Sequence, residues 1–366
     1  MRVSMTSRRD FLIRAAAVGV VGAGSLRIAH AAKADAGRDA SKVARGGVVQ
    51  TVLGPIDASK LGFTLTHEHV VPADYESSGS RKTFSSRAIS VADAVDKLKA
   101  ARDAGVRTVV DLSPSEAGRD VRFAAEVSRK SGMQIVVCTG QRLFLPELRD
   151  RTTTELTELF IKEIEQGIDG TGIKAGVIKA ATVSDGVTVF EERVLRAAAR
   201  ASKATGVPIQ THSNSRLRGG IKQADVFEAE GVSPARVSIG HSDDTDDMDY
   251  LIGLAKRGYT LGMDHAFWGM APGATLPWQK RVESVKRLMD AGFVDQIFFS
   301  NDWVHGDVER ERVNPEGMLF TLRKTIPYLK QLGVSEQQIQ AIAIQNPKRF
   351  FSRAAKPLDA ADTRRS

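Results

Sequence analysis

Two histidines in the stretch FTLTHEHVV, residues 63–71, are the first side chains whose types could do chemistry. The stretch otherwise reads as a buried strand, and burying an unpaired polar side chain is costly. Side chains at alternate positions of a strand share a face, so His67 and His69 are expected to point the same way. A metal ion is a partner that would satisfy both imidazoles.

Residues of similar chemistry follow other apolar runs along the chain. Five of the seven histidines end or follow such a run, and one aspartate and one lysine do the same. Beyond the first pair, these candidates are Lys179 in GVIKAAT, His212 in VPIQTHS, His241 in VSIGHS, His265 in YTLGMDH and Asp302 in QIFFSND. Imidazole and carboxylate ligands suit zinc, manganese or cobalt, so these residues predict a metal site wherever the ends of the runs converge.

Eight short apolar runs must position these side chains, and a helical pattern follows each of them. The runs are residues 63–69, 107–113, 134–140, 175–182, 207–213, 237–242, 259–265 and 296–302. Short strands alternating with helices indicate a parallel α/β sheet. Eight repeats predict a (β/α)₈ TIM barrel, whose active site lies at the carboxyl ends of the strands. The alternative is an open doubly wound sheet, but no G-x-G-x-x-G follows the first run.

Smaller signals outline the elements around the barrel. The turn-rich sequence VVQTVLGPIDASKLG, before the first run, predicts a short β-hairpin. Ser90-x-x-Asp93 and Thr188-x-x-Glu191 have the spacing of capping boxes and predict that helices begin there. The single cysteine, Cys138, cannot form an internal disulfide and is interpreted as packing.

The N-terminus, with SRRDFLIRAAAVGVVGAGSLRIAHAA, has the plan of a twin-arginine signal peptide over residues 1–31. We therefore expect export of the folded protein to a periplasmic location, free or membrane-associated on the periplasmic side. The alternative is a membrane-anchoring start, although the apolar run is too short to span a bilayer. A linker at 32–46, a hydrolase barrel at 47–352 and a polar tail at 353–366 would complete the chain.

The formal charge of +8 does not indicate a nucleic-acid partner. The first 31 residues carry five arginines and one aspartate, so about half of the excess belongs to the expected signal. No run of basic residues interleaved with aromatics occurs, and no other stretch is long and apolar enough to be transmembrane. A small-molecule substrate fits this composition better.

From about residue 47 to residue 351 the sequence resembles the phosphotriesterases (parathion hydrolases, or aryldialkylphosphatases) of the amidohydrolase superfamily. The resemblance is carried by GFTLTHEH, AGVRTVVDLS, GIKAGVIKAAT, TGVPIQTH, IGHSDDTDD, GMDH, SNDW and RVNPEGM. It implies a binuclear metal centre in a TIM barrel, usually of zinc with cobalt or manganese possible, and commonly a homodimer.

The resemblance also implies a role for each metal-site candidate. It assigns the more buried metal to His67, His69 and Asp302, the more exposed one to His212 and His241, and a bridging position to a carboxylated Lys179 and a hydroxide. The carbamate on Lys179 would form from CO₂. From the residue chemistry alone Lys179 stays open, because a lysine there could also reach the surface or pair with an acid.

A proton relay is the second implication of the resemblance. Asp302 would accept the proton of the bridging hydroxide and pass it through His265 to Asp244. Taken alone, Asp244 could equally belong to a solvated acidic loop, since SDDTDD holds four aspartates. Glu68 should point away from its histidine neighbours and is expected to support the site or the fold only.

The loops that would line the substrate pocket depart from the family pattern. Arg142 and Leu143 stand where parathion-hydrolysing members have aromatic residues, and the loop after the last run is shorter and carries His305 and Asp307. The loop after the seventh run is also short, although its neighbouring aromatics Phe267 and Trp268 could restore an apolar wall. Arg142 could bind an anionic substrate, pair with Asp307 or face solvent.

The function that the sequence favours is hydrolysis of phosphotriesters by attack of a metal-bridging hydroxide. The alternative is a lactonase, including acyl-homoserine lactones, with promiscuous phosphotriesterase activity. GMDH and GHSDDTDD favour the first of these. A binding protein without turnover would have lost a metal ligand, and a deaminase-like hydrolase with a single metal would leave Lys179 without a purpose.

Overall fold

The computed structural model describes residues 47–72, 86–142, 148, 150–183 and 186–353 of the chain. The expected signal peptide and linker, Leu143 and nearly all of the polar tail lie outside these residues. Within the described part of the chain, no helix combines the length and hydropathy that crossing a membrane requires.

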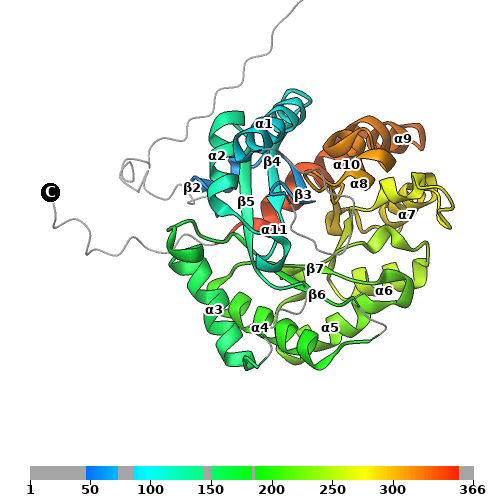
Figure 1. Ribbon diagram of the computed structural model, residues 1–366. Coiled ribbons are helices and arrows are strands. Elements are labelled where there is room, and N and C mark those ends of the chain that lie inside the picture. The colour runs from blue at the N-terminus through cyan, green and yellow to red at the C-terminus, as the bar shows by residue number, and fades with distance from the viewer. Residues whose placement is uncertain (1–46, 73–85, 143–147, 149, 184–185, 354–366) are drawn as a thin grey trace, which may run out of the picture. The chain divides into compact units, whose positions relative to one another are not determined.

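Eight parallel strands form a nearly closed barrel, which confirms the predicted TIM-barrel architecture (Figure 1). Each of the eight apolar runs overlaps one strand, and the strands neighbour one another in chain order. They are β3 (Phe63–Glu68), β4 (Val106–Asp111), β5 (Gln134–Gly140), β6 (Val177–Ala181), β7 (Ile209–His212), β8 (Val237–Ile239), β9 (Thr260–Met263) and β10 (Ile297–Phe299).

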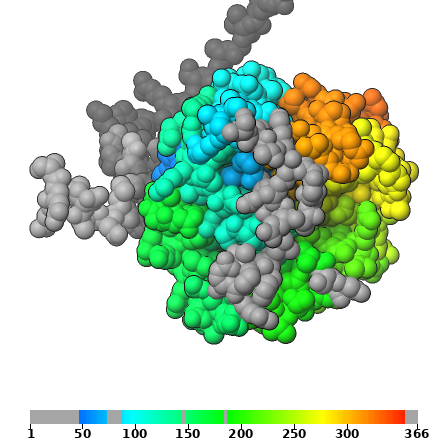
Figure 2. All heavy atoms as spheres, viewed as in Figure 1, coloured from blue at the N-terminus to red at the C-terminus, as the bar shows by residue number. Residues whose placement is uncertain are grey.

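Helices follow the strands and form the outer layer, and their colours run around the barrel in chain order (Figures 1 and 2). The first seven strands are each followed by one main helix: α1 (Arg87–Asp103), α2 (Val121–Ser131), α3 (Thr153–Glu165), α4 (Val189–Thr205), α5 (Gly219–Ala229), α6 (Met248–Lys256) and α7 (Trp278–Asp290). After β10 come α8 (Val308–Val313), α9 (Ile326–Gln331), α10 (Glu336–Gln340) and α11 (Asn346–Phe351). Most of the buried apolar side chains pack between the sheet and these helices.

The barrel closes between β3 and the segment that follows β10. The backbone N–H groups of Asp302 and His305 donate to the carbonyls of His67 and His69, at 2.9 Å each, and His69 N–H donates to Trp303 O at 2.7 Å. Glu68 reinforces this seam, because its carboxylate accepts the Trp303 N–H at 2.7 Å and bonds to the two residues before Asp302. The expected supporting role of Glu68 therefore corresponds to holding the seam that carries Asp302.

One of the two predicted capping boxes is wrong. Thr188 and Glu191 form a capping box at the start of α4, as predicted. Helix α1 instead begins one turn earlier, where the Ser86 hydroxyl accepts the N–H of Ile89. Ser90 is buried inside that helix and its hydroxyl lies 3.3 Å from His305 Nε2, so it makes a tertiary contact rather than a cap.

The predicted hairpin is present as β1 (Val48–Thr51) and β2 (Gly54–Asp57), which pair antiparallel. Val49 of this hairpin belongs to an apolar cluster with side chains of the barrel strands, such as Val177 and Phe298, and with Phe351. The cluster also contains Cys138, whose thiol pKa is raised by burial and which serves packing. The backbones of Val48 and Arg353 exchange two hydrogen bonds, at 2.9 and 3.1 Å.

Candidate metal centre

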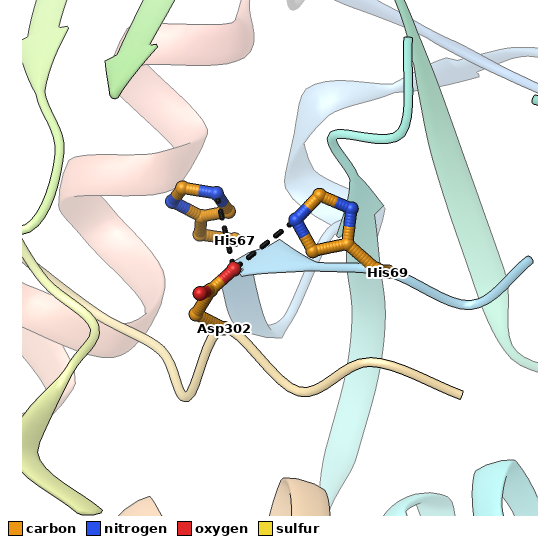
Figure 3. A group of neighbouring side chains, drawn as sticks. All are labelled: His67, His69 and Asp302. Carbon is orange, nitrogen blue, oxygen red and sulfur yellow. Dashed lines mark ion pairs between the residues drawn. The ribbon is translucent and has the colours of Figure 1, made fainter. Parts of the chain in front are cut away.

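The predicted metal ligands come together at the carboxyl ends of the strands. His67 and His69 at the end of β3 face Asp302 after β10, and all three side chains point toward one another (Figure 3). Asp302 Oδ1 lies 3.5 Å from His67 Nε2 and 3.1 Å from His69 Nε2. All three are buried, so two imidazole nitrogens and one carboxylate oxygen converge on a point shielded from water. This donor set fits a divalent cation.

A second pair of histidines lies beside the first group. His212 ends β7 and His241 follows β8. The Nδ1 atom of His212 lies 2.7 Å from the Nε2 atom of His241. Two imidazole nitrogens at this distance must share a proton or a cation. The His67 and His241 rings stack with centroids 4.9 Å apart, so the two groups form one continuous site.

Asp264, the last residue before His265, orients one histidine of each group. Its Oδ2 lies 2.7 Å from His67 Nδ1 and its Oδ1 lies 2.8 Å from His241 Nδ1. An acceptor at Nδ1 places the ring proton there and leaves Nε2 with its lone pair, which is how metal-ligating histidines are commonly held. Ser113 does the same for His69, with its hydroxyl 2.9 Å from Nδ1. The structure therefore prepares the Nε2 atoms of these three histidines to bind a cation.

Electrostatics separate these histidines from His265. Burial lowers the pKa of His67, His69, His212 and His241, which keeps them neutral as metal ligands must be. Burial acts in the same direction on His265, but the nearby carboxylates outweigh it and raise its pKa to about 10. Both nitrogens of His265 are engaged with carboxylates, so it does not fit the role of a ligand.

His265 links two carboxylates, in the arrangement that a proton relay requires. Its Nε2 lies 2.9 Å from Asp302 Oδ2 and its Nδ1 lies 2.9 Å from Asp244 Oδ2. Asp302 thus directs one oxygen to the histidine pair of β3 and the other to His265. Asp244 is partly buried and held in place, because Arg281 donates to its Oδ1 at 2.5 Å.

Lys179 projects from β6 into the same site and is almost completely buried. Its Nζ lies 3.0 Å from His67 Nε2, and burial lowers its pKa to about 8. Gly140 on β5 allows this strand to come close, since a Cβ atom there would lie 1.9 Å from the Lys179 carbonyl oxygen and its φ is +98°. The amine is therefore far easier to deprotonate than an exposed lysine and lies among the metal-site candidates.

Two of these residues have strained backbones. His241 and Asp302 have φ values of 56° and 46°, in the left-handed region that non-glycine residues rarely adopt. Such conformations persist only where surrounding contacts enforce them and are common at functional sites. For Asp302 the enforcing contacts are the hydrogen bonds of the seam between β3 and the segment after β10.

The predicted pocket residues differ in burial and in the contacts that they make. Phe267 is buried and packs against Trp268, which is partly exposed, with ring centroids 4.8 Å apart. Asp307 caps α8 by accepting the N–H of Arg310 at 3.0 Å, and its other oxygen lies 3.4 Å from Arg310 Nε. Arg142 is half-buried after β5, and Leu143 lies outside the described residues.

Two other features of this region concern His305 and Arg142. His305 is turned away from the site toward α1, where it lies near Ser90 and Asp93. The charge of Arg142 adds to burial in lowering the pKa of His212 and offsets the effect of acids on Lys179, so it acts on the centre.

Sequence reasoning missed four supporting residues: Ser113, Asp264, Arg281 and Arg310. Asp264 had a signal, because it stands at a strand end beside His265. Arg281 lies on the face of α7 that also carries Val285 and Leu288, and its exposure is only 1%. It donates to Asp243 O as well as to Asp244, so it ties α7 to the relay.

Removing the Arg281 charge is expected to destabilise the protein strongly. Arg281→Met would remove one of two cationic partners of Asp244, leaving His265, and would also remove the donor to the Asp243 carbonyl, which together cost about 2–3 kcal/mol. Urea unfolding should show a lower midpoint for this variant. The control is Arg287→Met near the end of the same helix, which should shift the midpoint by less than a quarter as much. Equal shifts would contradict the importance of the Arg281–Asp244 pair.

Comparison with known proteins places this centre in a family. Residues 47–351 match the profile of the Phosphotriesterase family, which covers most of the chain. The chain belongs to the phosphotriesterase family. The phosphotriesterase family consists of metal-dependent hydrolases, which agrees with the convergence of histidines and aspartates described above.

Relatives within the phosphotriesterase family carry more than one name. The chain is 35% identical to an aryldialkylphosphatase of Saccharolobus solfataricus over a 308-residue alignment, which covers 81% of this chain and 97% of that protein. It is 36% identical to a phosphotriesterase homology protein of Mycobacterium tuberculosis, over 83% of this chain and 98% of that protein. An N-acetyltaurine hydrolase of Danio rerio is 25% identical, over 84% and 98%. Membership of the family therefore supports a hydrolase, while the names of its members indicate different substrates.

Proposed function

We propose that this protein is a binuclear metal-dependent hydrolase that cleaves phosphotriesters. The observation that carries the proposal is the unbroken chain from the histidine pair of β3 through Asp302 and His265 to Asp244. One metal would be held by His67, His69 and Asp302, and the second by His212 and His241. These ligands suit zinc, cobalt or manganese, and zinc is the metal that the family resemblance implies.

Lys179 would complete the centre as a carbamate. Its low pKa supplies neutral amine, and the Nζ lone pair can attack CO₂ with loss of one proton to give an anionic group with two oxygens. A buried ammonium beside two dications would be repelled by them. The carbamate replaces that positive charge by a negative one and would give the two subsites a shared ligand.

Two bound cations would supply a water that is nucleophilic near neutral pH and would polarise the phosphoryl oxygen of the ester. The residues of the chain then have distinct tasks. Asp302 Oδ2 accepts the proton of the attacking water. In its neutral form, with the ring proton on Nδ1, His265 would accept the proton of Asp302 at Nε2 and release the Nδ1 proton to Asp244, which lies nearer the solvent. Asp264 and Ser113 keep the imidazoles turned toward the cations.

A lactonase is the second candidate, and the loop after β10 favours it. In this loop Asp307 caps a helix and His305 faces α1, so neither replaces the aromatic wall expected of parathion hydrolases. Among the described residues, the aromatic side chains in ring contact with His265 outside the histidine cluster are the buried Phe267 and the partly exposed Trp268, each with its ring centroid 6.5 Å from that of His265. Attack on a lactone carbonyl uses the same cation pair as attack on phosphorus.

The deciding experiment compares kcat/KM for paraoxon and for a panel of aliphatic lactones. It uses the zinc- or cobalt-loaded protein from residue 32 onward, the mature form that the sequence predicts. A preference for paraoxon of a hundredfold or more supports the phosphotriesterase. A preference for lactones of a hundredfold or more would replace the phosphotriesterase assignment with the lactonase and leave the metal centre in place. The metal-free protein serves as the control for both substrates.

A further inference from the structure

The motif RVNPEGM, which the metal centre does not use, forms one wall of a separate cavity. The cavity has a volume of about 260 Å³ and lies between α1 and the turn that follows α8. Its buried floor includes Trp303, Asn314 and Met318. Its mouth is lined by the partly exposed side chains of Lys97, Glu311 and Glu316. An apolar floor with a few polar groups is typical of sites for small organic molecules.

Asn314 places an unsatisfied acceptor on the floor of this cavity. The residue is only 3% exposed, and its Nδ2 donates to Gly317 O at 3.0 Å across the turn. Its Oδ1 is buried as well, and no described residue donates a hydrogen bond to it. Leaving a buried acceptor unpaired costs free energy, so a ligand with an N–H group would gain a hydrogen bond here.

The other groups of the lining favour an ammonium as the source of that N–H. The ring of Trp303 already faces a cation, because Lys97 Nζ lies 5.6 Å from the ring centre. Glu311 and Glu316 add carboxylate oxygens, which accept hydrogen bonds and cannot donate them. Both glutamates pair with cations of the chain, so a ligand would gain most at Asn314 Oδ1 and at the Trp303 ring.

We propose that this cavity binds a small primary amine with an apolar body. Its ammonium would donate to Asn314 Oδ1, and its body would pack on Trp303 and Met318. The site is separate from the metal centre and does not depend on the proposed hydrolase function. A cavity that holds only water is the competing explanation.

Two residues of the cavity lining adjoin Asp302 all the same. Trp303 follows Asp302 in the chain, and its carbonyl accepts the N–H of His69 at 2.7 Å. Glu311 follows Arg310, which donates to Asp302 Oδ2 at 2.6 Å. A bound amine would therefore touch the segments that hold this candidate metal ligand in place.

The test titrates benzylamine into the metal-loaded full-length chain and follows binding by ligand-observed NMR. Benzyl alcohol has nearly the same shape and no charge, and it is titrated beside the amine. The wild type is expected to bind benzylamine with a Kd of about 0.1–1 mM, which suits a ligand of so few atoms. Benzyl alcohol should bind at least tenfold more weakly.

Two variants locate the bound amine. Ala100 lines the cavity from an exposed position of α1, so the ring of Ala100→Phe would narrow the opening and should raise the Kd at least tenfold. Lys99→Phe is the matched control, because it adds the same ring at the next exposed position, outside the lining, and should keep the Kd within threefold. Asn314→Ala removes the acceptor and should raise the Kd about tenfold or more. If that variant does not fold, Ala100→Phe alone carries the test.

Three results would overturn the proposal. The first is no binding of benzylamine at about 10 mM, tenfold above the upper expected Kd, which would leave a cavity that holds only water. The second is binding that neither Ala100→Phe nor Asn314→Ala weakens, which would place the amine elsewhere, such as on a metal ion. The third is equal Kd values for amine and alcohol, which would remove the ammonium as the recognised group. None of these results bears on the hydrolase, which the paraoxon and lactone assays test separately.

Discussion

Asp302→Asn is expected to lower kcat by about 10³–10⁴-fold, the upper part of the range for losing a general acid–base group. Asparagine has nearly the same shape, so the seam between β3 and the segment after β10 should persist. The amide, however, carries no negative charge for a metal. It also cannot accept the proton of the attacking water and hand it on to His265. Both proposed tasks of Asp302, performed by its two oxygens, are lost together.

This expectation is checked by steady-state kinetics on whichever ester the wild type prefers, with metal content and circular dichroism measured on the same sample. Asp295→Asn is the matched control, because Asp295 lies just before β10 at the opposite end of the strand and is largely exposed. It should retain kcat within threefold. A folded Asp302→Asn enzyme with kcat also within threefold of wild type would refute the assigned role of Asp302.

Lys179→Ala is expected to lower kcat/KM by about 10²–10³-fold and to reduce the bound metal. Losing a residue that only supports a metal ligand costs 10- to 100-fold, and a shared ligand should cost more. A short carboxylic acid such as propionate should restore part of the activity, because it can enter the vacated space and supply two oxygens. Wild-type enzyme stripped of metal should regain activity faster with zinc when bicarbonate is present.

The carbamate makes a spectroscopic prediction as well. Reconstitution of the wild type with ¹³C-bicarbonate should give a carbamate carbon resonance that Lys179→Ala lacks. Lys174→Ala, a change in the loop before the same strand, should behave like the wild type in every assay. No bicarbonate effect and no resonance would show that Lys179 acts as an unmodified amine.

The fold could be predicted because it depends on short-range patterns. Apolar runs of strand length separated by helical segments leave few topologies, and the carboxyl ends of barrel strands meet at one rim. Residues at those ends, such as His212 and His241, were therefore brought together by the fold alone. The wrong cap at Ser90 shows the limit, because the same spacing also suits a buried contact with a distant histidine.

The supporting residues could not be predicted for a different reason. Asp264 reaches histidines that are 197 and 23 residues away, and both contacts depend on side-chain rotamers that no periodicity encodes. Arg281 lies on the apolar face of α7 and Arg310 lies on the highly charged helix α8, and the partners of both depend on the path of the loops. The left-handed backbone at Asp302 likewise arises from the seam and not from its own neighbours.

The pairing of Val48 with Arg353 has a topological consequence. Two backbone hydrogen bonds make the ends of the described barrel direct neighbours. A short peptide could join them without disturbing the sheet, and the chain could be opened instead at the exposed turn around Asp169, between α3 and β6. In such a circular permutant every strand would keep its neighbours in the barrel, and every candidate metal ligand would stay at the carboxyl ends of the strands. The order in which the βα units are synthesised is therefore separable from the architecture that they form.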